Sequence, residues 1–135
     1  MADAKTFALN LADFAAKAKG NADQVVRKVA IDALSNIVLR SPVDTGRFRA
    51  NWLVSVDEPA QDILDDVDPS GAEAIQSGSA ALSDAVAGPA IFITNNLPYA
   101  LRLENGWSKQ APSGMVRLAA AEFQTYVDDA VKSLP

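Results

Sequence analysis

The chain has 135 residues, of which 49% are hydrophobic and 21% charged, and its formal net charge is −5. These values fit one globular domain and exclude a disordered or membrane-spanning chain, because no apolar run approaches the ~18 residues that cross a bilayer. Cysteine and histidine are both absent, which excludes disulfides, thiolate nucleophiles, imidazole bases and nearly every zinc site.

The first predicted element is a short amphipathic helix near the N-terminus. Phe7, Leu11 and Phe14 recur at helical spacing. Gly20 follows where a C-terminal cap of such a helix would stand.

A longer helix is predicted next. Asn21 or Asp23 can cap its N-terminus, and the apolar side chains of residues 26–38 form a stripe with a 3.6-residue period. Pro42 ends this helix near residues 39–40, because proline lacks an amide hydrogen and disfavours helical geometry in the residue before it.

Residues 51–57 then alternate with period two, which predicts a strand with Trp52, Val54 and Val56 on one face. The following residues, 57–70, contain many acids, two prolines and no base, and this composition resists burial. We expect an exposed and mobile acidic loop here. Its central acids are Asp62, Asp65, Asp66 and Asp68.

The second half of the chain predicts a weak helix over residues 72–86 and a second strand that ends at Asn95. Residues 98–104 fit a short helix that begins at proline, but they also alternate like a strand, and both alternatives stay open. An ordered loop is predicted over residues 107–113, after a turn at Asn105.

A long C-terminal helix is predicted from Val116 to Leu134, with apolar residues on one side and Glu122 on its solvent side. The predicted elements form a single α+β domain over residues 1–135. In it, a small antiparallel β-sheet packs against two long helices, one N-terminal and one C-terminal, and an exposed acidic loop projects from it.

Charge is unevenly distributed along the chain. Residues 1–52 carry eight bases and five acids, whereas residues 53–105 carry nine acids and one base, Arg102. Opposed basic and acidic regions favour self-association over nucleic-acid binding, which requires a concentrated positive surface. The start of the chain lacks a basic segment followed by an apolar block, so we expect the protein to stay in the cytoplasm.

The sharpest candidate for chemistry is Asp44-Thr45-Gly46, the triplet with which retroviral-type aspartic proteases build half of a catalytic dyad. Two such carboxylates share one proton, and a dimer of this chain could supply both. Here a helix precedes the triplet and Arg47 follows it, which favours a turn closed by Asp44 with a positive φ angle at Gly46. Replacing Asp44 by Asn would abolish turnover in a protease, but would cost a structural turn about 1 kcal/mol.

Other chemical sites have weaker support. The acids from Asp62 to Asp68 lack the donor pattern of an EF-hand. Ser108 and Lys109 lack the spacing of a serine–lysine pair, and we expect no cofactor and no metal. Trp107 lies in a polar loop, so it is predicted to anchor that loop or to fill a pocket on a neighbouring subunit.

Several separated segments resemble a known family. A helix ends in Pro-Val-Asp-Thr-Gly-Arg-Phe-Arg with Trp52 soon after. An apolar strand then runs into Asn-Asn-Leu-Pro-Tyr-Ala, Leu-Glu-Asn-Gly-Trp-Ser and Gln-Ala-Pro-Ser-Gly-Met-Val before the last helix. Residues 41–52 and 91–116 thereby resemble the tail-completion or neck proteins of long-tailed bacteriophages and their prophages, the small head–tail joining family.

The resemblance implies a non-enzymatic structural protein of the virion that completes the tail and forms a hexameric ring. Its implied partners are further copies of itself, the tail tube or a tail terminator protein, and the head connector or stopper protein. DNA would pass through the ring without specific binding, and no membrane is involved. The implied location is the virion neck, and the host cytoplasm during assembly. The alternative within this class is a tail terminator that caps the tail tube.

By matching position, the resemblance places the structural turn at Asp44, Thr45, Gly46 and Arg47. We assign to the subunit or partner interface Arg49, Asn95, Asn96, Tyr99, Arg102, Glu104, Trp107 and Gln110. Asp62, Asp65, Asp66 and Asp68 are predicted to line the lumen, where carboxylates would repel passing DNA. Neutralising these four together should leave the monomer folded but impair assembly or DNA passage.

Overall fold

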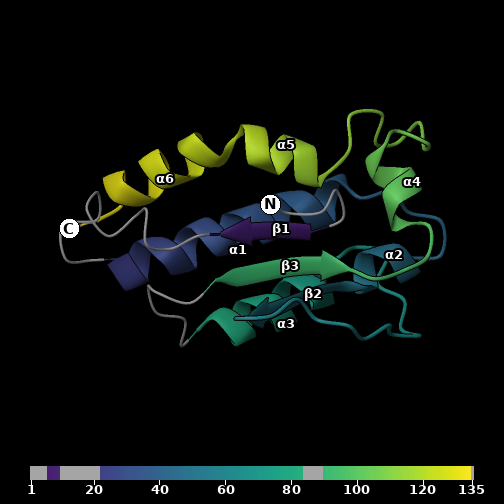
Figure 1. The fold of residues 1–135 in the computed structure, drawn as a ribbon, viewed down its shortest axis with the longest axis horizontal. Coiled ribbons are helices and arrows are strands. Elements are labelled where there is room, and N and C mark those ends of the chain that lie inside the picture. The colour runs from purple at the N-terminus through teal and green to yellow at the C-terminus, as the bar shows by residue number, and fades with distance from the viewer. Residues whose placement is uncertain (1–5, 10–21, 84–89, 135) are drawn as a thin grey trace.

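The computed structural model describes residues 6–9, 22–83 and 90–134. These residues form six helices and a three-stranded antiparallel sheet (Figure 1). The strands are β1 (Thr6–Leu9), β2 (Trp52–Val56) and β3 (Ile91–Asn95), and β3 lies between the other two. The helices are α1 (Ala22–Arg40), α2 (Arg47–Ala50), α3 (Ala72–Leu82), α4 (Ala100–Glu104), α5 (Val116–Ala121) and α6 (Phe123–Lys132). The predicted α+β class is confirmed.

Helix α1 is the central element of the core. It lies behind the sheet in Figure 1, with α5 and α6 along one side and α3 along the other. Val29, Ala33, Leu34 and Ile37 of its apolar stripe are fully buried, and the removal of this apolar surface from water is the main stabilising contribution. Within the described ranges, no helix is both long and apolar enough to cross a membrane.

The sheet register agrees with the period-two pattern of the sequence. Trp52 pairs with Asn95 and Val54 pairs with Ile93, so these residues share one face of the sheet. Trp52 is buried on that face and donates a hydrogen bond from its indole N–H to Ser41 Oγ at 2.7 Å. This hydrogen bond joins the start of β2 to the residue that follows α1.

The first predicted helix is wrong at its start. Phe7 lies in strand β1, where it pairs with Ile93. Pairing with β3 satisfies backbone groups that would otherwise lack partners, and this tertiary contact overrides local periodicity. Leu11, Phe14 and Gly20, on which the prediction also depended, lie outside the described residues.

The C-terminal prediction needs a second correction, because the predicted long helix is two helices, α5 and α6. The chain bends between them at Glu122, where φ is −94° and ψ is 1°. The bend accompanies an ion pair between Glu122 and Arg40 at the end of α1. The open alternative at residues 98–104 resolves as helix α4.

The acidic segment after β2 is tied to the body of the protein at several points. The backbone of Leu64 accepts from and donates to the side-chain amide of Asn51, at 3.0 and 2.7 Å. The Asn96 side chain donates to the carbonyls of Ala60 and Asp62 at 2.7 and 3.1 Å. Most of its side chains are exposed as predicted, yet its backbone path is fixed by these bonds.

Candidate functional site

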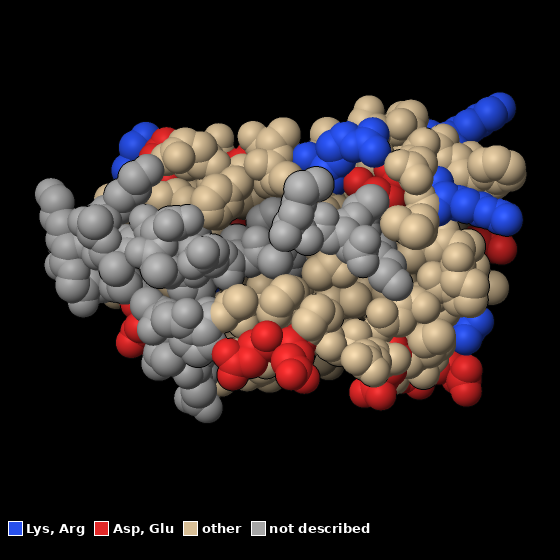
Figure 2. Space-filling model, viewed as in Figure 1, with Lys and Arg blue, Asp and Glu red and all other residues tan. Residues whose placement is uncertain are grey.

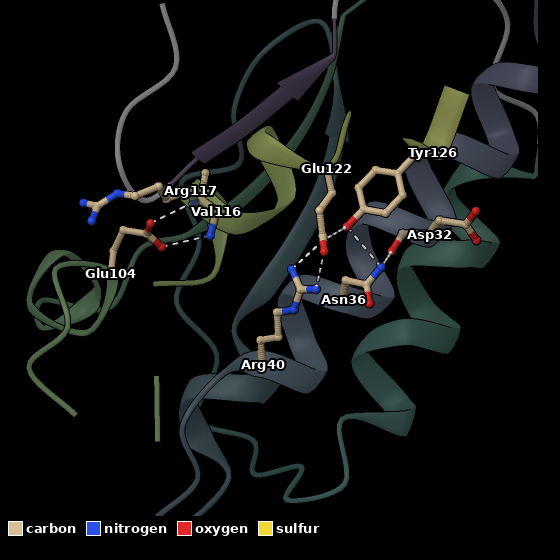
Figure 3. Close-up of polar contacts among 8 residues, drawn as sticks. All are labelled: Asp32, Asn36, Arg40, Glu104, Val116, Arg117, Glu122 and Tyr126. Carbon is tan, nitrogen blue, oxygen red and sulfur yellow. Dashed lines mark hydrogen bonds and ion pairs between the residues drawn. The ribbon is translucent and has the colours of Figure 1, made fainter. Parts of the chain in front are cut away.

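Glu104 is a buried carboxylate at the end of α4, with 2% of its surface exposed. Its Oε1 accepts a hydrogen bond from the backbone N–H of Met115 at 3.0 Å. Oε1 also accepts from the backbone N–H of Val116, and Oε2 from that of Arg117, each at 2.9 Å (Figure 3). Such N–H groups at the start of a helix have no partner within the helix. Glu104 therefore caps α5 from a different helix.

Two glycines allow the loop between α4 and α5 to close tightly. A Cβ at Gly114, where φ is 81°, would lie 2.6 Å from Oε2 of Glu104. A Cβ at Gly106, where φ is 85°, would lie 2.6 Å from the carbonyl oxygen of Pro112. Glycine alone adopts such angles readily while permitting this close approach. The loop is therefore held in one shape from both ends.

This rigid loop displays Trp107 to solvent, with 76% of the residue exposed. The Arg102 guanidinium lies 5.7 Å from the centre of the indole ring, in cation–π geometry. Tyr99 and Leu101 beside it are 36% and 45% exposed, and Lys109 is exposed as well. We name these five residues, Tyr99, Leu101, Arg102, Trp107 and Lys109, the Trp107 surface.

A hollow of about 240 Å³ adjoins the Trp107 surface. Residues 42–46 form one wall, and Phe48, Tyr99 and Leu103 contribute apolar lining. Gln110 connects the two sides, because its amide accepts from the N–H of Val43 at 2.9 Å and donates to the carbonyl of Val43 at 3.1 Å. The loop that carries Trp107 is thus joined to the Asp-Thr-Gly turn.

The Asp-Thr-Gly turn is built around Gly46, which has the positive φ expected of it, 96°. A Cβ at this position would lie 2.5 Å from the nitrogen of Pro69. The local side-chain hydrogen bond comes from Thr45, whose Oγ1 accepts from the N–H of Arg47 at 3.2 Å. Asp44 was expected to close the turn, but its side chain is exposed and Thr45 has that role.

A polar network joins α1 to the bend between α5 and α6 (Figure 3). Arg40 forms an ion pair of 2.7 Å with Glu122, and Tyr126 donates to the same carboxylate at 2.8 Å. Asn36 donates to the hydroxyl oxygen of Tyr126 at 3.1 Å. Hydrogen bonding to Arg40, and then to Tyr126, lowers the pKa of Glu122. Burial and the neighbouring Glu122 raise the pKa of Tyr126 to about 12.

Three residues assigned to an interface or a lumen are buried inside the subunit instead. Besides Glu104, Asn95 is fully buried and donates to the carbonyl of Phe48 at 2.9 Å. Asp68 is 5% exposed and accepts from the N–H of Ala74 at 2.9 Å, so it caps α3. Buried polar groups must find partners within the fold, and these side chains therefore cannot reach a second molecule.

Arg49 and Asn96 also make contacts within the subunit. Arg49 donates to the carbonyls of Leu39, Ser41 and Pro69 at 3.0, 3.0 and 2.9 Å. Three bonds of this kind order the chain where α1 ends, and Asn96 holds the acidic segment as described above. Tyr99, Arg102 and Trp107 keep the exposure that an interface requires.

Sequence reasoning missed three features of the structure. Asp68 precedes α3 as a helix cap does, and this local signal could have been recognised. Glu122 and Tyr126 are four residues apart on one helix face, which is also a visible pattern. The capping of α5 by Glu104 had no such signal, because its partners lie 11 to 13 positions away.

The described part of the chain contains no group of three or more Asp or Glu side chains that could hold a metal ion. No protein-family model, no curated protein and no solved structure matches the chain. The geometry of the Trp107 surface and the resemblance of the surrounding segments are therefore the two grounds for assigning a function.

Proposed function

We propose that this protein is a structural, non-enzymatic component of a phage neck or tail, which completes the tail and joins it to the head connector as a ring. The main support for the proposal is the exposure of Trp107. This residue is 76% exposed and lies against Arg102 on a loop of fixed shape. Tryptophan and arginine dominate the binding energy of protein interfaces. A large exposed indole is more typical of a surface that binds a partner than of an isolated monomer.

The packing beneath the Trp107 surface supports the same function. Glu104 fixes the far end of the loop through three backbone hydrogen bonds, and Gln110 fixes its middle through Val43. A loop that is already ordered loses little entropy on binding. The carboxylate of Glu104 is occupied by backbone donors, so its role in this proposal is structural.

The protease alternative depends on Asp44, whose side chain is exposed. A catalytic aspartate dyad needs two carboxylates held close together and shielded from water. We expect Asp44→Asn to change the free energy of unfolding by less than about 0.5 kcal/mol, as for other surface substitutions, rather than the larger loss expected for a closed turn. Loss of a measurable peptidase activity in this variant would contradict the structural function.

The decisive experiment is deletion of the gene in the phage or prophage that carries it. We expect filled heads and tails of normal length to accumulate separately, and the purified protein to restore infectious particles when it is added to the extract. Overlong tails would indicate a tail terminator instead. Normal virions in the deletion strain would refute both functions.

A matched pair of variants tests the Trp107 surface in the same extract. Trp107→Ala should lose most of the restored infectivity, because the exposed indole is removed while the fold is kept. Val56→Ala is the control, since Val56 is 43% exposed but lies at the far end of β2 from α4. Equal restoration by both variants would show that Trp107 is not part of the interface.

A further inference from the structure

Among the described residues, two regions of exposed charge differ in sign, one around α4 and one after β2. Several bases of the N-terminal half are engaged within the subunit: Arg40 pairs with Glu122, Arg49 binds backbone carbonyls, and Lys28 pairs with Asp32. Figure 2 shows Lys and Arg mainly over the upper right of this face, near α4 and α5, and Asp and Glu mainly along the lower edge, near β2 and the segment after it. The exposed bases Arg102 of α4 and Lys109 of the loop after it belong to the basic region.

The acidic edge also presents exposed apolar side chains. Ile63 is 48% exposed and Val67 is 54% exposed, and they alternate with Asp62, Asp65 and Asp66, which are all exposed. We name these five residues the acidic surface. Its carboxylates are largely available, because Asp65 is fully exposed and its 3.6 Å contact with Arg47 is a weak surface ion pair.

The two surfaces carry opposite charges, and both also expose apolar side chains. The Trp107 surface combines exposed apolar groups with the cations Arg102 and Lys109, and the acidic surface combines exposed apolar groups with carboxylates. The hollow beside Tyr99 is open to solvent and has a mixed lining, in which Phe48 and Leu103 form an apolar part that can receive Ile63 or Val67. A contact of this composition has an apolar centre and a charged rim, as protein interfaces do.

We propose that the Trp107 surface of one subunit docks on the acidic surface of a second copy of this chain. This inference rests on the proposed function, and it identifies the contact that would build the ring. Because the two surfaces differ, the contact can be made head to tail and repeated around an axis until the ring closes. Asp62, Asp65 and Asp66 therefore lie between subunits and not in the lumen.

Charge reversal provides the test. At about 1 mM protein and about 50 mM salt, where surface charges are weakly screened, sedimentation should show the wild-type chain associating, and about 1 M salt should weaken the association. The double variants Arg102→Glu/Lys109→Glu and Asp62→Lys/Asp66→Lys should each raise the dissociation constant about tenfold or more. All four changes in one chain should restore it to within about threefold of wild type, because the charges are complementary again.

The control is Asp128→Lys/Asp129→Lys, which reverses two exposed carboxylates on α6 at the opposite end of the molecule and should leave association unchanged. Far-UV circular dichroism establishes that each variant is folded. The proposed contact would be overturned if the wild-type chain stays monomeric under all conditions, or if neither double variant weakens association. It would also be overturned if the fourfold variant does not recover association. If the purified protein nevertheless restores infectivity, the head–tail joining function stands and this contact alone is refuted.

Discussion

Replacement of Glu104 tests whether a buried carboxylate orders the loop that presents Trp107. In the Glu104→Ala variant, the backbone N–H groups of Met115, Val116 and Arg117 lose their acceptor. A hydrogen bond to a charged group contributes about 1.5–3 kcal/mol, and a buried donor without a partner costs about 1–3 kcal/mol. Three bonds that share one carboxylate are not additive, so we expect a loss of about 3–5 kcal/mol in the free energy of unfolding.

Glu104→Gln should have a smaller effect. The amide keeps the shape of the side chain and one acceptor oxygen, but its NH₂ group then faces at least one backbone donor. We expect a loss of about 1–3 kcal/mol for this variant. The order of stability should therefore be wild type, then Gln, then Ala.

Urea unfolding followed by far-UV circular dichroism measures these differences, with equal m-values as the check that the extent of unfolding is unchanged. Glu58→Gln is the matched control, because Glu58 is exposed and its side chain should contribute less than about 0.5 kcal/mol. A loss below about 1 kcal/mol for Glu104→Ala would refute the capping role, since even one unpaired buried amide should cost more than that.

Further predictions concern the turn and the polar network. Gly46→Ala brings a Cβ within 2.5 Å of the Pro69 nitrogen at a φ of 96°, so urea unfolding should show a loss of about 2 kcal/mol or more, and unchanged stability would contradict this reading. Arg40 lowers the pKa of Glu122 below its ordinary 4.5. The ion pair contributes about 1 kcal/mol or less to stability, because the carboxylate is half-exposed. This contribution is present at neutral pH and is lost as the pH falls through the lowered pKa. The stability difference between wild type and Glu122→Gln should therefore vanish in acid, and a difference that persists at low pH would refute the ion pair. Burial and Glu122 raise the pKa of Tyr126 from 10.0 to about 12. As the pH rises between these values, the hydroxyl of Tyr126 ionises in the unfolded chain before it does in the folded one, so wild type should lose more stability than Tyr126→Phe. Parallel curves of stability against pH for the two proteins would contradict the shift.

The helices and strands that were predicted best are those whose local pattern and tertiary packing agree. The stripe along α1 and the proline after it gave both the extent and the buried face of that helix. The period-two alternation of apolar residues in β2 predicted which side chains face the core, and the pairing with β3 agrees with that prediction. Local propensity and burial favour the same structure in these elements, so the sequence pattern is sufficient.

The predictions failed where a distant contact decides the local structure. Phe7 is in a strand because β3 offers an edge to pair with. The C-terminal helix bends at Glu122, the residue that pairs with Arg40, which lies 82 positions earlier. Neither partner is visible in a local window, and both contacts compete with a helical pattern that is otherwise consistent.

The sequence alone excluded whole classes of chemistry, because a chain without cysteine and histidine cannot form their sites. It also predicted that Trp107 is not part of the core, since a tryptophan in a polar loop has no local reason to be buried, and the structure leaves 76% of it exposed. The tertiary structure decided which polar residues are available to a partner. Glu104, Asn95 and Asp68 resemble surface residues in composition, but the fold places backbone groups around them that need hydrogen bonds. Burial is a property of the whole chain's packing, and for this reason only the structure separates the residues that hold the loop from those that it displays.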